Sequence, residues 1–118
     1  MKENVAKMKK LAPAIFILLL STGAAAQGAV WADGNLIKRV CEGNVSERGS
    51  CLGFVTAVAE ILADPFYGIG GKVCFPQGTT SVQLQAAFLK YLKDHPEVLR
   101  ISAARLAVQA LEQTFPCR

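Results

Sequence analysis

Apolar residues recur at helical spacing in four stretches of the chain, separated by glycine, proline and polar residues. The spacing predicts helices over 33–41, 51–64, 80–94 and 95–114, because apolar positions three and four residues apart share one face of an α-helix. Short connections favour antiparallel neighbours. The pattern therefore predicts an all-α fold, a small domain of four helices.

Local signals mark the ends of these helices. Residues 42–50 are polar and contain two glycines, which predicts a loop. Pro65 ends the second helix, because the residue before a proline avoids helical backbone angles. Thr80 and Gln83 have the spacing of a capping box at the start of the third helix. Pro96 fits the first turn of a fourth helix that opens at His95, where a missing N–H is tolerated.

The fourth predicted helix carries two apolar stripes. One consists of Leu99, Ala103, Leu106 and Ala110, and the other consists of Ile101, Ala104, Val108, Leu111 and Phe115. A surface helix needs only one such stripe. The helix is therefore either surrounded by the core or covered on its outer side by a second copy of the chain, and periodicity leaves both interpretations open.

The second predicted helix is apolar on nearly every side. Its polar face is a narrow line formed by Gly53, Thr56, Glu60 and Asp64. Two acids one turn apart could serve acid–base chemistry, but such a pair is more typical of a solvated helix face. The absent side chain of Gly53 would permit a close helix crossing.

The segment 65–71 is unusual for a connecting loop, because it combines Phe66, Tyr67 and Ile69 with three glycines. Exposed aromatic rings in a loop favour recognition of a partner. The alternative is that Phe66 and Tyr67 fold back over the core. The glycines do not form a phosphate loop, since Lys72 is not followed by serine or threonine.

Residues 1–26 have the organisation of an export signal. Lysines precede an apolar run over 11–20, and Ala24–Ala26 supplies small residues for cleavage after Ala26. The run is too short for a transmembrane helix, so no membrane association is expected after cleavage. Met8 begins a complete signal of its own and is an alternative start. We expect a soluble product outside the cytoplasm, consisting of one domain over residues 27–118.

Removing the export signal lowers the net charge of the protein. The chain has a net charge of +4, but residues 1–26 contribute four lysines and one glutamate, which leaves nine bases, eight acids and a net charge of +1. Binding to the phosphates of nucleic acid requires a basic stripe, and none remains. Nucleic acid is therefore not an expected partner.

Four cysteines are expected to staple this domain. Cleavage leaves 92 of the 118 residues, and a domain of this size buries only about 60 to 65 per cent of its unfolded surface and therefore benefits from covalent links. Four cysteines allow three pairings, and antiparallel neighbours favour Cys41 with Cys51 at one end and Cys74 with Cys117 at the other. A zinc site is disfavoured, because the chain has no C-x-x-C, a single histidine and exported, oxidisable thiols.

No residue pattern indicates an active site. His95 is the only histidine and lies at a helix junction, which is typical of a capping residue. Ser50, Ser81 and Ser102 do not lie in a nucleophile-elbow motif. We expect no enzymatic activity, no cofactor and no metal.

The order of several short motifs carries a family resemblance. From the N-terminus they are Asp33-Gly34-Asn35-Leu36, Cys51-Leu52-Gly53-Phe54-Val55, Cys74-Phe75-Pro76-Gln77-Gly78, Tyr91-Leu92 before His95-Pro96, and Phe115-Pro116-Cys117. With the cysteine order and the export signal, they resemble the Tai/Rap family of periplasmic immunity proteins, which protect bacteria from type VI secreted peptidoglycan amidases.

The resemblance implies a disulfide-stapled helical homodimer that blocks the cleft of a secreted amidase and performs no chemistry of its own. Contacts in this family come from variable segments, and our candidates are Phe66, Tyr67 and Ile69, with Glu60 and Asp64 nearby. One alternative is a small periplasmic acid-stress chaperone, although eight acids and one histidine leave few groups to drive a pH switch. Another is an exported subunit of a larger assembly.

Overall fold

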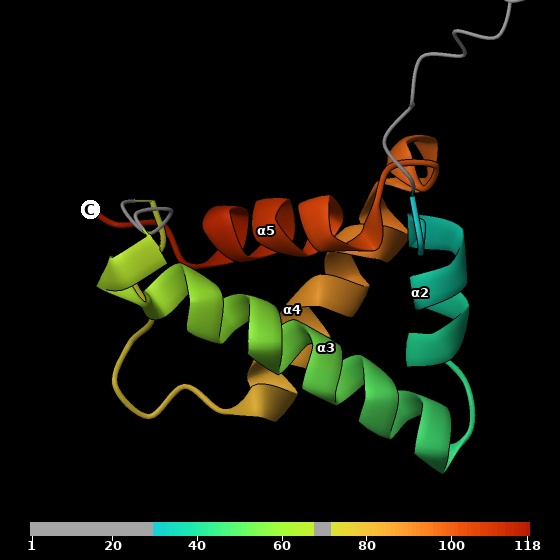
Figure 1. Cartoon of the computed structure of the whole chain (residues 1–118), viewed down its shortest axis with the longest axis horizontal. Helices are drawn as coiled ribbons and strands as arrows, with labels where there is room; N and C mark the ends of the chain where they lie inside the picture. Colours follow the sequence, from blue (N-terminus) through green and yellow to red (C-terminus); the bar gives the residue numbers. More distant parts are fainter. Residues whose placement is uncertain (1–29, 68–71) are drawn as a thin grey trace, which may run out of the picture.

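The computed structural model describes residues 30–67 and 72–118, which contain four α-helices and no strand. The helices are α2 (Gly34–Cys41), α3 (Val45–Ala63), α4 (Ser81–Asp94) and α5 (Ala103–Thr114), with 3-10 turns η1 (Pro65–Tyr67) and η2 (Pro96–Val98) (Figure 1). The predicted all-α, four-helix fold is confirmed. The predicted export signal over 1–26 and the candidate contact Ile69 lie outside the described residues.

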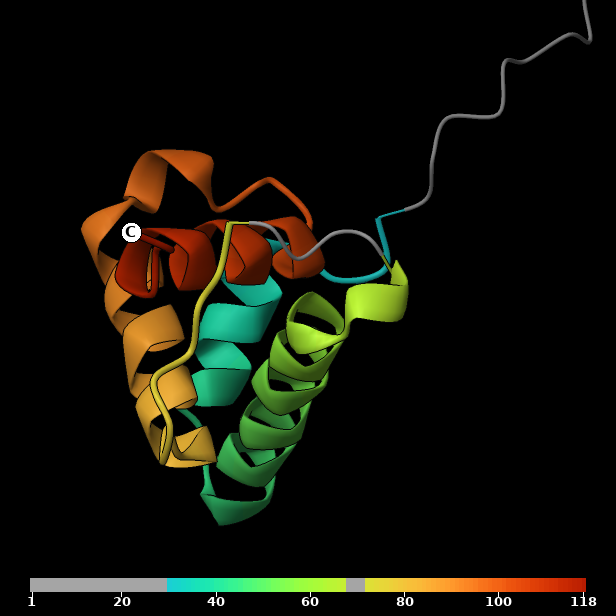
Figure 2. The same cartoon turned by 90° about the vertical axis from the view of Figure 1, so that its left-hand side faces the viewer.

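The four helices form one bundle around a shared interior. Helices α2, α3 and α4 contact one another, and α5 contacts all three. Figure 2 shows α5 lying across one end of the other helices. Within the described residues, no helix is long and apolar enough to span a membrane.

Helix α3 begins earlier than the sequence pattern predicted. The Asn44 side chain accepts a hydrogen bond from the Glu47 backbone N–H at 3.0 Å, and the Glu47 carboxylate accepts one from the Asn44 N–H at 2.7 Å. This capping box satisfies donors that a helix start leaves unpaired. The predicted loop over 42–50 is therefore wrong beyond residue 44, and Gly49 is accommodated inside the helix at a cost of about 1 kcal/mol relative to alanine.

The fourth helix begins later than predicted. Only Pro96–Val98 is helical after His95, as a single 3-10 turn, and α5 starts at Ala103, where the Ser102 hydroxyl accepts a hydrogen bond from the Arg105 N–H. The prediction of a continuous helix from His95 is wrong, because the carbonyl groups between the turn and α5 bond to a distant part of the chain.

Those carbonyl groups bind the first turn of α2. The Gly34 N–H donates to the Ile101 carbonyl at 3.0 Å, and the Asn35 N–H donates to the Leu99 carbonyl at 3.0 Å. A side chain at Gly34 would lie 2.6 Å from a methyl group of Leu106, so the close approach requires glycine. The start of α2 is thereby fixed against the start of α5.

The later start of α5 removes the basis for two apolar stripes. Leu99 and Ile101 precede the helix, Ala104 is exposed, and Val108 is only half-buried. The buried residues form one broad face, consisting of Ala103, Leu106, Ala107, Ala110 and Leu111. Helix α5 thus has the single buried face of an ordinary bundle helix, and it no longer supports a homodimer.

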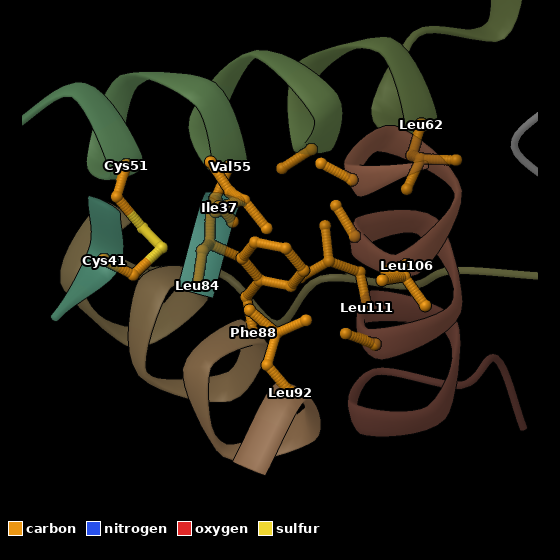
Figure 3. Packing of buried hydrophobic residues seen from close by; sticks show 14 of the residues in the cluster. Ile37, Cys41, Cys51, Val55, Leu62, Leu84, Phe88, Leu92, Leu106 and Leu111 are labelled. Carbon is orange, nitrogen blue, oxygen red and sulfur yellow. A yellow bond between two sulfur atoms is a disulfide. The ribbon is translucent and has the colours of Figure 1, made fainter. Parts of the chain in front are cut away.

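The core is apolar and centred on α4. Phe88 is fully buried, and Figure 3 shows its ring among side chains from α2, α3 and α5, including Ile37, Val55 and Leu111. Phe54 of α3 lies with its ring centroid 6.0 Å from that of Phe88. No buried polar side chain occurs among the described residues, so the core depends on shape and apolar burial.

Both expected disulfides are present. Cys41–Cys51 joins the end of α2 to α3, and its two residues are 2% and 0% exposed. Cys74–Cys117 is exposed and joins the segment before α4 to the C-terminus. There the Cys74 N–H also donates to the Phe115 carbonyl at 2.9 Å. One bridge belongs to the core and the other fastens a surface segment.

We expect Phe88→Ala to lower the free energy of unfolding by about 3–5 kcal/mol, because it removes a fully buried ring and leaves a cavity. Urea denaturation measures the change. The matched control is Val82→Ala on the same helix, where the side chain is 66% exposed and the expected change is below about 0.5 kcal/mol. Equal effects of the two substitutions would contradict the assignment of Phe88 to the core.

We expect mild reduction without denaturant to open Cys74–Cys117 before Cys41–Cys51, because thiol attack requires access to the sulfur atoms. Treatment with dithiothreitol, alkylation and peptide mass mapping would show modified Cys74 and Cys117 first. The same reaction in guanidinium chloride serves as a control in which all four cysteines react. Equal modification of both pairs in the folded protein would refute this order.

Candidate partner-binding surface

Two aromatic side chains project from the end of α3. Phe66 is 87% exposed and Tyr67 is 56% exposed, and their rings meet edge to face with centroids 5.6 Å apart. Of the two interpretations that the sequence left open, folding back over the core is excluded. The turn η1 presents both rings to solvent.

One residue connects this turn to the helix. Asp64 is the C-cap of α3, and its N–H donates to the Glu60 carbonyl at 3.0 Å. Its carboxylate accepts a hydrogen bond from the Phe66 N–H at 2.8 Å, and its carbonyl accepts one from the Tyr67 N–H at 3.3 Å. The two aromatic residues are therefore hydrogen-bonded to the residue that ends the helix.

A groove of about 270 Å³ runs beside the same end of α3. Among the described residues, Glu60 is the one charged residue that lines it, and Asp64 does not line it. Thr56, Ala59 and Ala63 share the α3 wall with Glu60. The two acids thus lie near each other on the helix but face different surroundings.

The opposite wall of the groove comes from residues 75–84. Gly78 turns the chain there with a φ of +87°, a backbone angle that favours glycine. The Thr79 hydroxyl donates to the Pro76 carbonyl at 2.7 Å and closes the turn. Sequence reasoning missed this wall, although Pro76 and Gly78 were signals of a turn after Cys74.

The solvent-facing side of α3 carries a further exposed apolar residue. Ile61 is 43% exposed because it lies off the buried line of Cys51, Val55, Ala59 and Leu62. Its exposure was not predicted, since the helix is apolar on nearly every side.

Gly53 faces open space, because a methyl group added to its Cα would have no described atom from another element within 4 Å. The expected close helix crossing at Gly53 is therefore not present within the described chain.

Three of the residues considered for catalysis have structural roles. His95 is the C-cap of α4, its Nδ1 lies 2.9 Å from the Tyr91 carbonyl oxygen, and its ring stacks on that of Tyr91 with centroids 4.2 Å apart. The Ser50 hydroxyl donates to the Ser46 carbonyl, and Ser102 caps α5. Among the described residues, no three side chains of the metal-binding types His, Cys, Asp and Glu form a cluster.

Charge effects are found elsewhere on the molecule. A hydrogen bond from Lys38 lowers the pKa of the Glu42 carboxyl group, and a hydrogen bond from Lys90 lowers the pKa of Asp94. Both ion pairs link residues four apart at the surface, Lys38 being half-buried, and such pairs stabilise only weakly. The surface at the end of α3 consists instead of exposed apolar rings beside a groove with one acid, an arrangement suited to binding.

The chain matches the model of a known protein family. The family model of the Rap1a immunity proteins matches residues 33–117, which includes all four helices and all four cysteines. Comparisons with curated proteins and with solved structures gave no significant match. The matched region covers most of the sequence. The chain therefore belongs to the family of Rap1a immunity proteins.

Proposed function

We propose that this chain binds a type VI secreted peptidoglycan amidase and blocks its substrate cleft. Membership of the Rap1a family indicates an immunity protein against a type VI effector. The amidase as target is our proposal, and the observation that carries the binding site is the pair of exposed rings at Phe66 and Tyr67. In this proposal the chain acts by occlusion and has no enzymatic activity.

The exposed rings have the properties of interface anchors. Aromatic side chains bury a large area with few rotatable bonds, and tyrosine adds a hydroxyl group that can bond in a partly wet interface. Phe66 and Tyr67 project from a turn rather than a flat face, so they can enter a concave site. Glu60 in the adjacent groove would meet the partner at the rim, where a charge mainly affects orientation and association rate.

The proposed location follows from the proposed target. An inhibitor of a peptidoglycan amidase has to reach the periplasm, where its family typically acts. We propose that residues 1–26 direct export and that cleavage follows Ala26. Two disulfides in a small domain support an oxidising compartment.

A homodimer is also part of the proposal. Helix α3 supports it, because Ala57 and Ile61 are exposed on its outward side within the described chain. A second copy could cover these apolar positions. Sedimentation of the oxidised protein would measure the oligomeric state.

We expect oxidised protein of residues 27–118 to inhibit peptidoglycan cleavage by one type VI amidase encoded in the same genome. Inhibition should be complete when the number of chains of this protein equals the number of amidase active sites. Release of soluble fragments from purified peptidoglycan measures the activity. The control is an amidase of a different family acting on the same substrate. If no type VI amidase is inhibited, the proposed target is wrong, and suppression of acid-induced aggregation would then favour the chaperone.

We expect the double substitution Phe66→Ala and Tyr67→Ala to weaken amidase binding at least about 30-fold, since one hot-spot residue contributes about 2 kcal/mol. Thermal unfolding should be unchanged, because both side chains are exposed. Calorimetric titration measures the affinity.

The matched control is Val45→Ala, which removes a side chain that is 78% exposed at the other end of α3, about 27 Å away along the helix. This variant should bind like the unmodified protein. A loss of folding in the double variant would instead assign the two rings to the core, and unchanged binding would exclude them from the interface.

A further inference from the structure

Within the described residues, the turn that presents the two rings is not held by burial in the core. Pro65, Phe66 and Tyr67 are all exposed, and η1 contains no buried residue. A surface turn without core contacts normally samples several backbone conformations. Its conformation here therefore depends on local hydrogen bonds.

Asp64 accepts every backbone hydrogen bond that this turn can donate. Pro65 has no N–H, the Phe66 N–H donates to the Asp64 carboxylate, and the Tyr67 N–H donates to the Asp64 carbonyl. Asp64 itself is bonded through its own N–H to Glu60 in the last turn of α3. The backbone direction of the turn relative to the helix is thus set at a single residue.

The side chain and backbone of Asp64 are suited to ordering this turn. An aspartate or asparagine oxygen reaches the N–H two residues ahead, which produces an Asx turn. The ψ of +116° at Asp64 lies in the extended region that a following proline favours. Pro65 then fixes its own φ angle, so few backbone torsions remain free before the first ring.

We infer that Asp64 is a positioning residue, which orders the backbone of residues 65–67 before the partner arrives. Its carboxylate acts through the Phe66 N–H and need not touch the partner. This inference deepens the proposed function and rests on it for the effect on binding. It changes the role expected from the sequence, where Asp64 was a candidate contact.

A pair of substitutions separates positioning from charge contact. Asp64→Asn removes the charge but keeps an oxygen at the same place, whereas Asp64→Ala removes both. We expect the asparagine variant to bind the amidase within about twofold of the unmodified protein. The alanine variant should bind about tenfold more weakly, because the partner then has to order the turn during binding.

Glu60→Ala is the matched control for the loss of an acid in the measurements on the free protein. It removes one negative charge a single turn earlier on α3 and leaves the hydrogen bonds of the Phe66 and Tyr67 N–H groups in place. The thermal midpoint of all three variants should stay close to that of the unmodified protein, since both acids are exposed.

A measurement on the free protein tests the turn without any amidase. Amide hydrogen exchange by NMR should show a protected Phe66 N–H in the unmodified protein, in Asp64→Asn and in Glu60→Ala, and an unprotected one in Asp64→Ala. Equal exchange in the two Asp64 variants would overturn the inference. Equally weak amidase binding by both Asp64 variants would also overturn it and make the carboxylate a direct contact.

The two proposals fail in different ways. If no amidase binds the unmodified protein, the proposed function is wrong, while the exchange pattern still decides whether Asp64 orders the turn. If the amidase binds and the double variant at residues 66 and 67 does not, the proposed function holds whatever the exchange pattern shows.

Discussion

The exclusion of water from the ring of Phe88 is the constraint on which this small domain depends. Every helix contributes side chains to the cluster around that ring, and the described core contains no buried polar side chain. A domain of this size buries only a modest share of its surface. The Cys41–Cys51 bridge adds a covalent link inside the cluster, so apolar burial and the disulfide stabilise the same contact between α2 and α3.

The second constraint is the bonding of α2 to the chain before α5. Carbonyl groups of Leu99 and Ile101 accept hydrogen bonds from the first N–H groups of α2, which a helix start otherwise leaves unsatisfied. Because these carbonyl groups are bonded to α2, the chain does not continue as a helix after His95. The same bonds place α5 across the end of the bundle (Figure 2), and α5 leads through Phe115 to the Cys74–Cys117 bridge and the groove wall.

The parts of the fold that depend on local signals could be predicted from the sequence. Periodicity located α2 and α4 closely, and the antiparallel argument gave both disulfides. The start of α3 could also have been predicted, because Asn44 and Glu47 have the spacing of a capping box, but the nearby glycines favoured a loop. The start of α5 was not readable, because it depends on bonds to Gly34 and Asn35, more than sixty positions earlier. At the candidate surface, the sequence identified Phe66 and Tyr67 but not their exposure, and the groove wall required a contact between distant segments.

The separation of the aromatic turn from the core affects how this protein can diversify. The side chains at positions 66 and 67 make no contribution to the buried cluster, whereas a residue such as Gly34 cannot change without displacing Leu106. Duplicated copies of such a chain can therefore exchange these two side chains freely while the bundle stays intact. Under the proposed function, the fold thereby offers an evolutionary route to new effector specificities that does not pass through unstable intermediates.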